Sequence, residues 1–208
     1  MGTDIHARLR VKTWNNEWEY HELPYEFDCR DYDFFAILAN VRNGYGFGGT
    51  ARYADSKPVQ SFTNDRGLPE DLKHHETDVY GDTYGDYGDH SLGYITLAEL
   101  KRDIKLASQE VIRTGVVPLE VYRSLKPGKG PDEWSGWISG KGIKVVKQDA
   151  VTDDIATQFP DDRIYVEMQW KDKPFKDKIK SLISWMSHYQ SWRDETGDDV
   201  QLVFGFDS

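Results

Sequence analysis

The sequence predicts an α+β fold, with a mixed, mainly antiparallel sheet that carries helices on one face. Two observations support this class. Apolar and polar residues alternate over 3–11 and 164–170, whereas 31–43, 96–115 and 174–197 have helical spacing. The resulting order, β-β-α, a long loop, α, then β-α-β, is typical of such folds. The 208 residues suit one domain, which we expect over 1–208.

The chain begins with a predicted antiparallel hairpin. Over 3–11, apolar residues face one way and polar residues the other, as in a half-buried strand. A turn at 14–17 and a returning strand over 17–23 follow, and Pro24 ends the hairpin. Asp31 or Asp33 can cap the next helix, which we expect to end at Asn43-Gly44.

Residues 43–92 are rich in Gly, Asp and Tyr, and this is long for a connection within a domain. We therefore expect a functional or mobile loop, with an acidic lid over 80–89. Thr96 and Glu99 form a capping box, Thr-x-x-Glu, at the start of a helix that we expect to end near Gly115.

The second half predicts a short helix over 119–125, strands over 143–147 and 164–170, and a helix from Pro174 to Gly197. The apolar stretch 200–207 predicts a strand near the centre of the sheet. Both chain ends are thus expected in one sheet.

Composition narrows the function classes. The single cysteine, Cys29, rules out an internal disulfide and suits a reducing, cytoplasmic setting. No apolar stretch approaches the roughly 20 residues that cross a bilayer, so we expect no membrane insertion. The net charge of −10 argues against bulk nucleic-acid binding but leaves a small anionic ligand open. A homo-oligomer also stays open.

Asp4 and His6 lie on one face of the first predicted strand, where both could bind a divalent metal or transfer a proton. An ordinary solvent-facing strand would have the same pattern. Parity puts Asp207 on the polar side of the last strand, so it can join Asp4 and His6 if the two strands are neighbours. These three residues are the metal candidates; no other cofactor is expected.

Arginines of the first third of the chain could line an anion-binding cleft, since a guanidinium group binds planar anions well. In the turn 66–71, RGLPED, glycine and proline could hold Arg66 against such an anion, although the segment could equally lead into a short helix. His90 and Ser91 precede a predicted strand, where Ser91 could instead cap a turn. The candidate ligand-binding residues are His6, Arg8, Arg42, Asn43, Arg66, Asp71, His90 and Ser91.

Four motifs resemble a family of short proteins carried by tailed bacteriophages and their hosts. They are MGTDIH at 1–6, RDYDFFAILANVRN at 30–43, RGLPED at 66–71 and VFGFD at 203–207. The resemblance covers the first hundred residues and the last strand. It implies an accessory, anti-defence role in the host cytoplasm, where defence systems signal with modified or cyclic nucleotides. Family members often have a second histidine near His90, where this chain has Leu92, and this difference weakens a dinuclear metal site.

Three functions follow as hypotheses. The first is a protein that binds and sequesters a small phosphate-bearing, nucleotide-like ligand in a cleft of Arg, His and aromatic residues. The second is a metal-dependent or acid/base hydrolase, a phosphodiesterase of the same ligands, with Asp4, His6 and His90 as catalytic residues. The third is an acidic inhibitor that binds a protein partner. The residue spacing contains no complete metal-ligand set, which favours the first.

Overall fold

The computed structural model describes residues 2–44, 57–72 and 90–207. The tract 80–89 and most of the expected long loop lie outside them. The chain divides into two compact units. Met1–Asn43, Val59–Gln109 and Pro174–Ser208 form the terminal unit, and Gly44–Pro58 with Glu110–Lys173 forms the inserted unit. The single domain over 1–208 stays a prediction.

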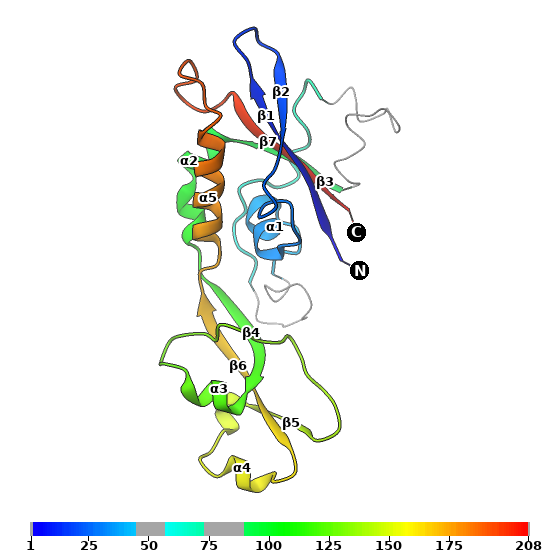
Figure 1. Ribbon diagram of the computed structural model, residues 1–208, viewed down its shortest axis with the longest axis vertical. Coiled ribbons are helices and arrows are strands. Elements are labelled where there is room, and N and C mark those ends of the chain that lie inside the picture. Colours follow the sequence, from blue (N-terminus) through cyan, green and yellow to red (C-terminus); the bar gives the residue numbers. More distant parts are fainter. Residues whose placement is uncertain (1, 45–56, 73–89, 208) are drawn as a thin grey trace. The chain divides into compact units, whose positions relative to one another are not determined.

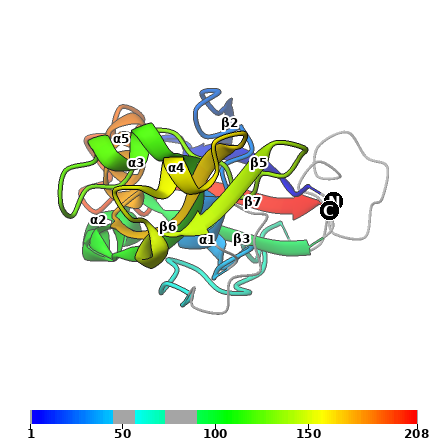
Figure 2. The same cartoon turned by 90° about the horizontal axis from the view of Figure 1, so that it is seen from below.

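An antiparallel sheet with the strand order β2-β1-β7-β3 forms the centre of the terminal unit (Figure 1). Its strands are β1 (Asp4–Lys12), β2 (Trp18–Glu22), β3 (His90–Thr96) and β7 (Val200–Asp207). The predicted hairpin and the central last strand are confirmed. The two chain ends lie side by side in both Figure 1 and Figure 2 because β1 and β7 pair in opposite directions.

The two faces of this sheet differ in their covering. On one face β7 presents Phe204 and Phe206, both fully buried. Helix α1 (Tyr32–Ala39) covers this face, and its Phe35 ring meets Phe206 edge to face with 5.0 Å between ring centroids. On the other face Leu68 and Leu72 cover Val203. Segment 66–72 therefore covers part of the face that carries the polar side chains of β1.

Helix capping follows the sequence, but the helix ends differ from those predicted. Asp31 caps α1, whose helix ends at Asn40 in left-handed conformation rather than at Asn43-Gly44. The capping box of Thr96 and Glu99 is present at α2 (Leu97–Arg102). Helix α5 (Phe175–Ser187) follows Pro174 and ends well before Gly197, and it contacts α1 and α2.

The helix predicted to run from Thr96 to near Gly115 is wrong in its second half. After α2 and a 3-10 turn at Ile104–Ser108, the chain forms strand β4 (Val111–Pro118). Val111 and Ile112 fit both a helical and a strand spacing. They pair with β6 instead, because β-branched side chains pack well on a pleated surface.

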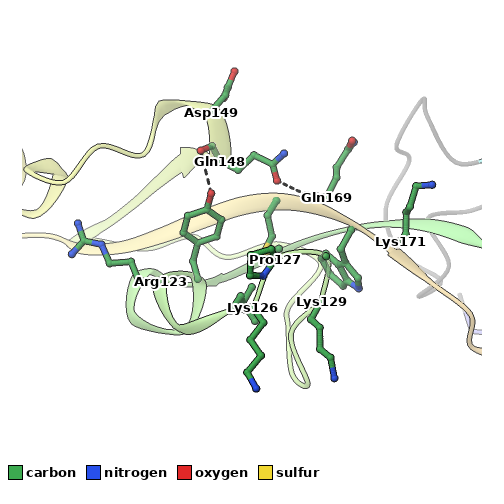
Figure 3. A pocket seen from close by; sticks show the side chains of 13 residues that line it. Arg123, Lys126, Pro127, Lys129, Gln148, Asp149, Gln169 and Lys171 are labelled. Atoms are coloured by element: carbon green, nitrogen blue, oxygen red, sulfur yellow. Dashed lines mark hydrogen bonds between the residues drawn. The ribbon is translucent and has the colours of Figure 1, made fainter.

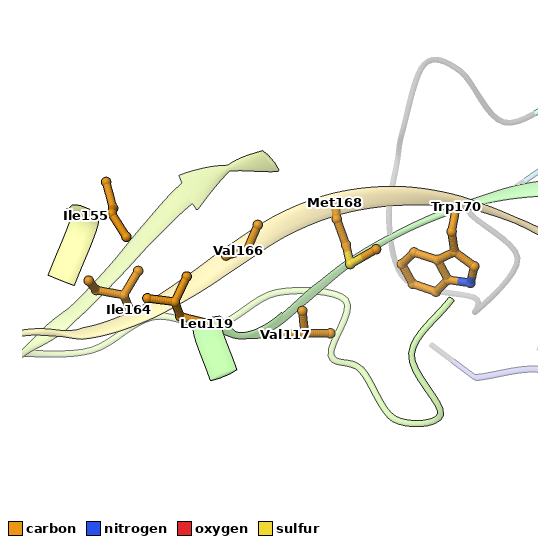
Figure 4. Packing of buried hydrophobic residues seen from close by; sticks show 7 residues of the cluster. All are labelled: Val117, Leu119, Ile155, Ile164, Val166, Met168 and Trp170. Atoms are coloured by element: carbon orange, nitrogen blue, oxygen red, sulfur yellow. The ribbon is translucent and has the colours of Figure 1, made fainter. Parts of the chain in front are cut away.

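The inserted unit has its own small sheet. Strand β6 (Arg163–Asp172) lies between β4, to which it is antiparallel, and β5 (Ile143–Lys147), to which it is parallel. Helices α3 (Leu119–Ser124) and α4 (Ile155–Gln158) complete it. Figure 4 shows its buried cluster, which consists of Val117, Leu119, Ile155, Ile164, Val166, Met168 and Trp170.

The α+β class is confirmed, but the described residues form two sheets where the sequence analysis expected one. The pattern of apolar residues identifies strands, yet it does not say which strands share a sheet. None of the helices in the described ranges has both the length and the apolar character to cross a membrane.

Candidate functional site

Three predicted residues meet at the end of the terminal sheet. The β1–β7 register puts Asp4 opposite Asp207, and the Asp4 backbone N–H donates to Asp207 Oδ1 at 3.2 Å. His6 Nε2 lies 3.0 Å from Asp207 Oδ2. Arg30, which the sequence analysis did not select, donates to both carboxylate oxygens of Asp4 at 2.8 and 2.6 Å. We call Asp4, His6, Arg30 and Asp207 the terminal network.

The terminal network keeps its two carboxyl groups ionised. Hydrogen bonds from Arg30 lower the pKa of Asp4, and Arg30 adds a favourable Coulomb interaction. The hydrogen bond with His6, followed by that from the Asp4 backbone, lowers the pKa of Asp207. An imidazole fixed at one nitrogen by a carboxylate has its other nitrogen available for proton transfer. The network therefore has the groups for acid/base chemistry.

The metal prediction for Asp4, His6 and Asp207 has no support in this geometry. Within 2–44, 57–72 and 90–207, no three His, Cys, Asp or Glu side chains are grouped so that they could hold a metal ion. The physical reason is visible at Asp4, whose two oxygens already accept hydrogen bonds from Arg30. The Asp4 carboxylate is therefore paired with the Arg30 guanidinium group rather than free to bind a metal ion.

The terminal network predicts a stability that depends on acidic pH. A carboxyl group whose pKa in the folded state lies below its ordinary value of 3.8 stabilises the fold above that pH. This stabilisation is lost as the pH falls through the lowered pKa. We therefore expect the free energy of unfolding to fall less steeply below about pH 4 in Asp207→Asn than in the parent protein.

Urea denaturation followed between pH 5 and 2.5 checks this expectation. Asp132→Asn is the matched control, since Asp132 is an exposed aspartate of the inserted unit. Parallel pH curves for Asp207→Asn and the parent protein would contradict a stabilising role for the Asp207 contacts.

His90 does not join the terminal network, so the predicted catalytic group of Asp4, His6 and His90 is not assembled. His90 pairs in register with Phe206, and the two rings stack with 6.1 Å between centroids. It therefore shares the face of Phe206, whereas His6 shares the opposite face with Asp207. His90 Nδ1 lies 3.1 Å from Ser91 Oγ, at a bulge between His90 and Gly93.

The two charged predicted residues of the RGLPED turn form ion pairs with other residues of the terminal unit. Arg66 donates to Glu99 at 2.7 Å and stacks over the Tyr94 ring at 3.7 Å. Asp71 accepts two hydrogen bonds from Arg10, at 2.7 and 3.0 Å. Both predicted ligand-binding residues thus have partners within the chain, and the turn has a structural explanation.

The remaining predicted ligand residues contact other parts of the chain. The Asn43 side-chain amide binds the Val59 backbone twice: Nδ2 donates to the Val59 carbonyl at 2.7 Å, and Oδ1 accepts from the Val59 N–H at 2.8 Å. Arg42 donates to Thr3 Oγ1 at 3.0 Å and lies over the Tyr32 ring. Arg8 is half-buried on β1, opposite Glu22 and Val203. Ligand binding by these residues stays a prediction.

A pocket of about 710 Å³ lies in the inserted unit, and none of the residues that line it was predicted as a site residue from the sequence. Its volume falls within the range of small-molecule sites, roughly 300–1,000 Å³. Leu125, Met168 and Trp170 give it apolar walls. Four cationic side chains, Arg123, Lys126, Lys129 and Lys171, line it beside one carboxylate, Asp149 (Figure 3). We call it the lysine pocket.

A tight turn carries two of these cations. Residues 126–129 read Lys-Pro-Gly-Lys, and Lys129 N–H donates to the Lys126 carbonyl at 3.0 Å. Gly128 has φ +78°, which with proline before it is the pattern of a type II turn. Figure 3 shows the Lys126 and Lys129 side chains extending in the same direction, while Asp149 points the opposite way. We call these two residues the lysine pair.

The ammonium groups of the lysine pair have no ion pair or hydrogen bond with any described residue. The other two cations of the pocket are engaged. Arg123 donates to the carbonyls of Thr152 and Asp153, at 3.3 and 3.0 Å, and Lys171 pairs with Glu110 at 2.7 Å. Among the four cations of the lysine pocket, the lysine pair therefore holds the two that have neither a hydrogen bond nor an ion pair with a described residue.

The wall formed by Trp170 is closely packed. Its ring meets Trp134 edge to face, with 5.3 Å between centroids. A Cβ added at Gly130 would lie 2.1 Å from the Trp170 ring, so only glycine leaves room for the indole there. Trp170 is 8% exposed, which makes it a fixed apolar wall rather than an open stacking platform.

The inserted unit is the less acidic part of the chain. Residues 110–173 contain ten Lys or Arg and eleven Asp or Glu, so nine of the ten net negative charges lie elsewhere. An anion therefore meets less repulsion here than on the rest of the protein. The sequence signal for this site is Lys-Pro-Gly-Lys, in which a proline-glycine turn brings two lysines close together.

Comparison of the chain with protein-family models, with curated proteins and with solved structures finds no match.

Proposed function

We propose that the chain binds a small phosphate-bearing, nucleotide-like ligand in the lysine pocket and sequesters it unchanged. The observation that carries this proposal is the lysine pair, whose two positive charges have no counter-charge among the described residues. Ammonium groups donate charge-assisted hydrogen bonds to phosphate oxygens. In the phage context that the sequence resemblance implies, such binding would remove a nucleotide signal of host defence.

The apolar walls of the lysine pocket favour a ligand with a ring beside its phosphate. Leu125, Met168 and Trp170 offer apolar surface next to the lysine pair. Binding without conversion is favoured because the described residues that line the pocket include no histidine, cysteine or serine. The pocket has groups to hold an anion but no paired nucleophile and base.

The test of this proposal is equilibrium dialysis of the purified chain against AMP, cyclic AMP and ADP-ribose, followed by heat release and chromatography. We expect at least one of these nucleotides to bind and to be recovered intact. Lys126→Gln/Lys129→Gln should weaken binding by roughly 10- to 100-fold, since two charge-assisted contacts are lost.

The matched control is Lys176→Gln/Lys180→Gln, which removes the same charge from exposed positions of α5. Equal weakening by both double variants would show only a general charge effect and would contradict the lysine pocket as the site. Absence of binding by all three nucleotides would contradict the proposal for these ligands.

A second candidate function is acid/base hydrolysis at the terminal network, favoured by the 3.0 Å contact between His6 and Asp207. Here His6 would accept a proton from water and Asp207 would hold the imidazole. This function predicts a new nucleotide species in the dialysis experiment. The conversion should be lost in His6→Ala and retained in Lys126→Gln/Lys129→Gln; recovery of the intact nucleotide alone would count against it.

A further inference from the structure

The turn 126–129 holds two positive charges close together. Proline and the left-handed glycine restrict its backbone, and the hydrogen bond from Lys129 to Lys126 closes it. Two lysines at the first and last positions of a β-turn have Cα atoms within about 7 Å. Their ammonium groups can therefore reach one and the same anionic group.

We infer that the lysine pair selects a phosphate monoester, the terminal phosphate of a ligand, over a phosphodiester. The inference rests on the proposed function and narrows its ligand class. A monoester carries about −1.5 to −2 charges at neutral pH and offers three terminal oxygens. A diester carries one charge, so it would leave one of the two ammonium groups uncompensated.

Nothing else described at the pocket supplies the missing negative charge. Asp149 points away from the lysine pair (Figure 3). The remaining cations hold their own partners, since Lys171 pairs with Glu110 and Arg123 with backbone carbonyls. A ligand at the lysine pair therefore meets two ammonium groups that have no counter-charge among the described residues, and a dianion matches their charge.

The apolar walls of the lysine pocket select a second property of the ligand besides its charge. Met168 and Trp170 are nearly buried and border the same pocket, so a ring joined to the phosphate gains apolar contact that free phosphate lacks. The preferred ligand class is thus a phosphate monoester on a ring-bearing group. A cyclic nucleotide, whose phosphate is a diester, fits the lysine pair less well.

Three phenyl compounds test the charge directly because they share the ring. Phenyl phosphate gains its second charge near pH 6, whereas phenyl sulfate and methyl phenyl phosphate carry one charge at every pH used. Ligand-observed NMR titrations of the full chain at pH 5 and pH 8 give the affinities. We expect phenyl phosphate to bind about tenfold more tightly at pH 8 than at pH 5, as for one added charge-assisted contact.

Phenyl sulfate and methyl phenyl phosphate should show no such gain. The gain should disappear in Lys126→Gln/Lys129→Gln and persist in Lys176→Gln/Lys180→Gln. Equal affinities for the three compounds at pH 8, or a pH gain that survives loss of the lysine pair, would overturn the inference. Nucleotide binding that depends on the lysine pair would still support the proposed function in that case, so the two can fail separately.

Discussion

Replacing Phe204 with alanine is expected to lower the free energy of unfolding by about 3–5 kcal/mol. Phe204 is fully buried in the central strand β7 and meets Phe206 edge to face, with 6.1 Å between ring centroids. Removing its ring leaves a cavity in the most buried part of the terminal sheet. Urea denaturation measures the loss. Phe204→Leu, which retains most of the apolar volume, should cost clearly less.

Gly93 supplies a second, independent check on the Phe204 ring. A Cβ at Gly93 would lie 2.9 Å from Phe204 Cε2, so Gly93→Ala must push against the ring. We expect this substitution to destabilise the parent protein but to cost little in the Phe204→Ala background, where the ring is absent. Additive effects in the double variant would contradict the contact.

The second large effect is expected at Asp71. Its carboxylate neutralises Arg10, whose side chain is 1% exposed and lies over the Trp18 ring at 4.0 Å. Asp71→Ala should cost about 3 kcal/mol because it leaves a buried guanidinium without its counter-charge. Arg10→Met should cost only about 1 kcal/mol, because the half-exposed carboxylate of Asp71 regains water and methionine still packs on Trp18.

The order of these two effects is the decisive result. The double variant Arg10→Met/Asp71→Ala should be more stable than Asp71→Ala alone, since no buried charge is then left unpaired. Urea denaturation of the four proteins gives the coupling energy. If Arg10→Met lowered the free energy of unfolding more than Asp71→Ala, the pair would stabilise the protein through packing of the aliphatic part of Arg10 rather than through charge.

Local features of the fold were predictable because they depend on neighbouring residues. The capping box at Thr96 and the alternation over 3–11 each follow from a few positions, and the structure contains both. Helix ends were less predictable. Val111 fits a helix extending from Thr96 as well as a strand, and pairing with Asp172 far along the chain decides between them.

In the candidate sites, too, the sequence predicted contacts within regular neighbouring strands but not contacts that depend on distant residues. Parity placed Asp207 beside Asp4 and His6, because both strands are regular and adjacent. Parity could not place His90, because its register with β7 was unknown and a bulge between His90 and Gly93 changes the side-chain alternation. The partners of Arg66 and Asp71 are distant in the sequence. The sequence pattern of the turn therefore could not distinguish a ligand-binding site from a set of ion pairs within the chain.

The pairing of Val111 with Asp172 has a consequence for how the chain could be rearranged. Directly opposed residues of antiparallel strands lie only about 4.5–5.5 Å apart, so the segment 110–173, the larger part of the inserted unit, begins and ends at neighbouring positions. Residues 110–173 thus form an insertion whose first and last strands, β4 and β6, pair with each other. A chain in which a short turn joins Gln109 to Pro174 would retain every strand of the terminal sheet. It would lack the lysine pocket, because all residues that line this pocket lie within 110–173.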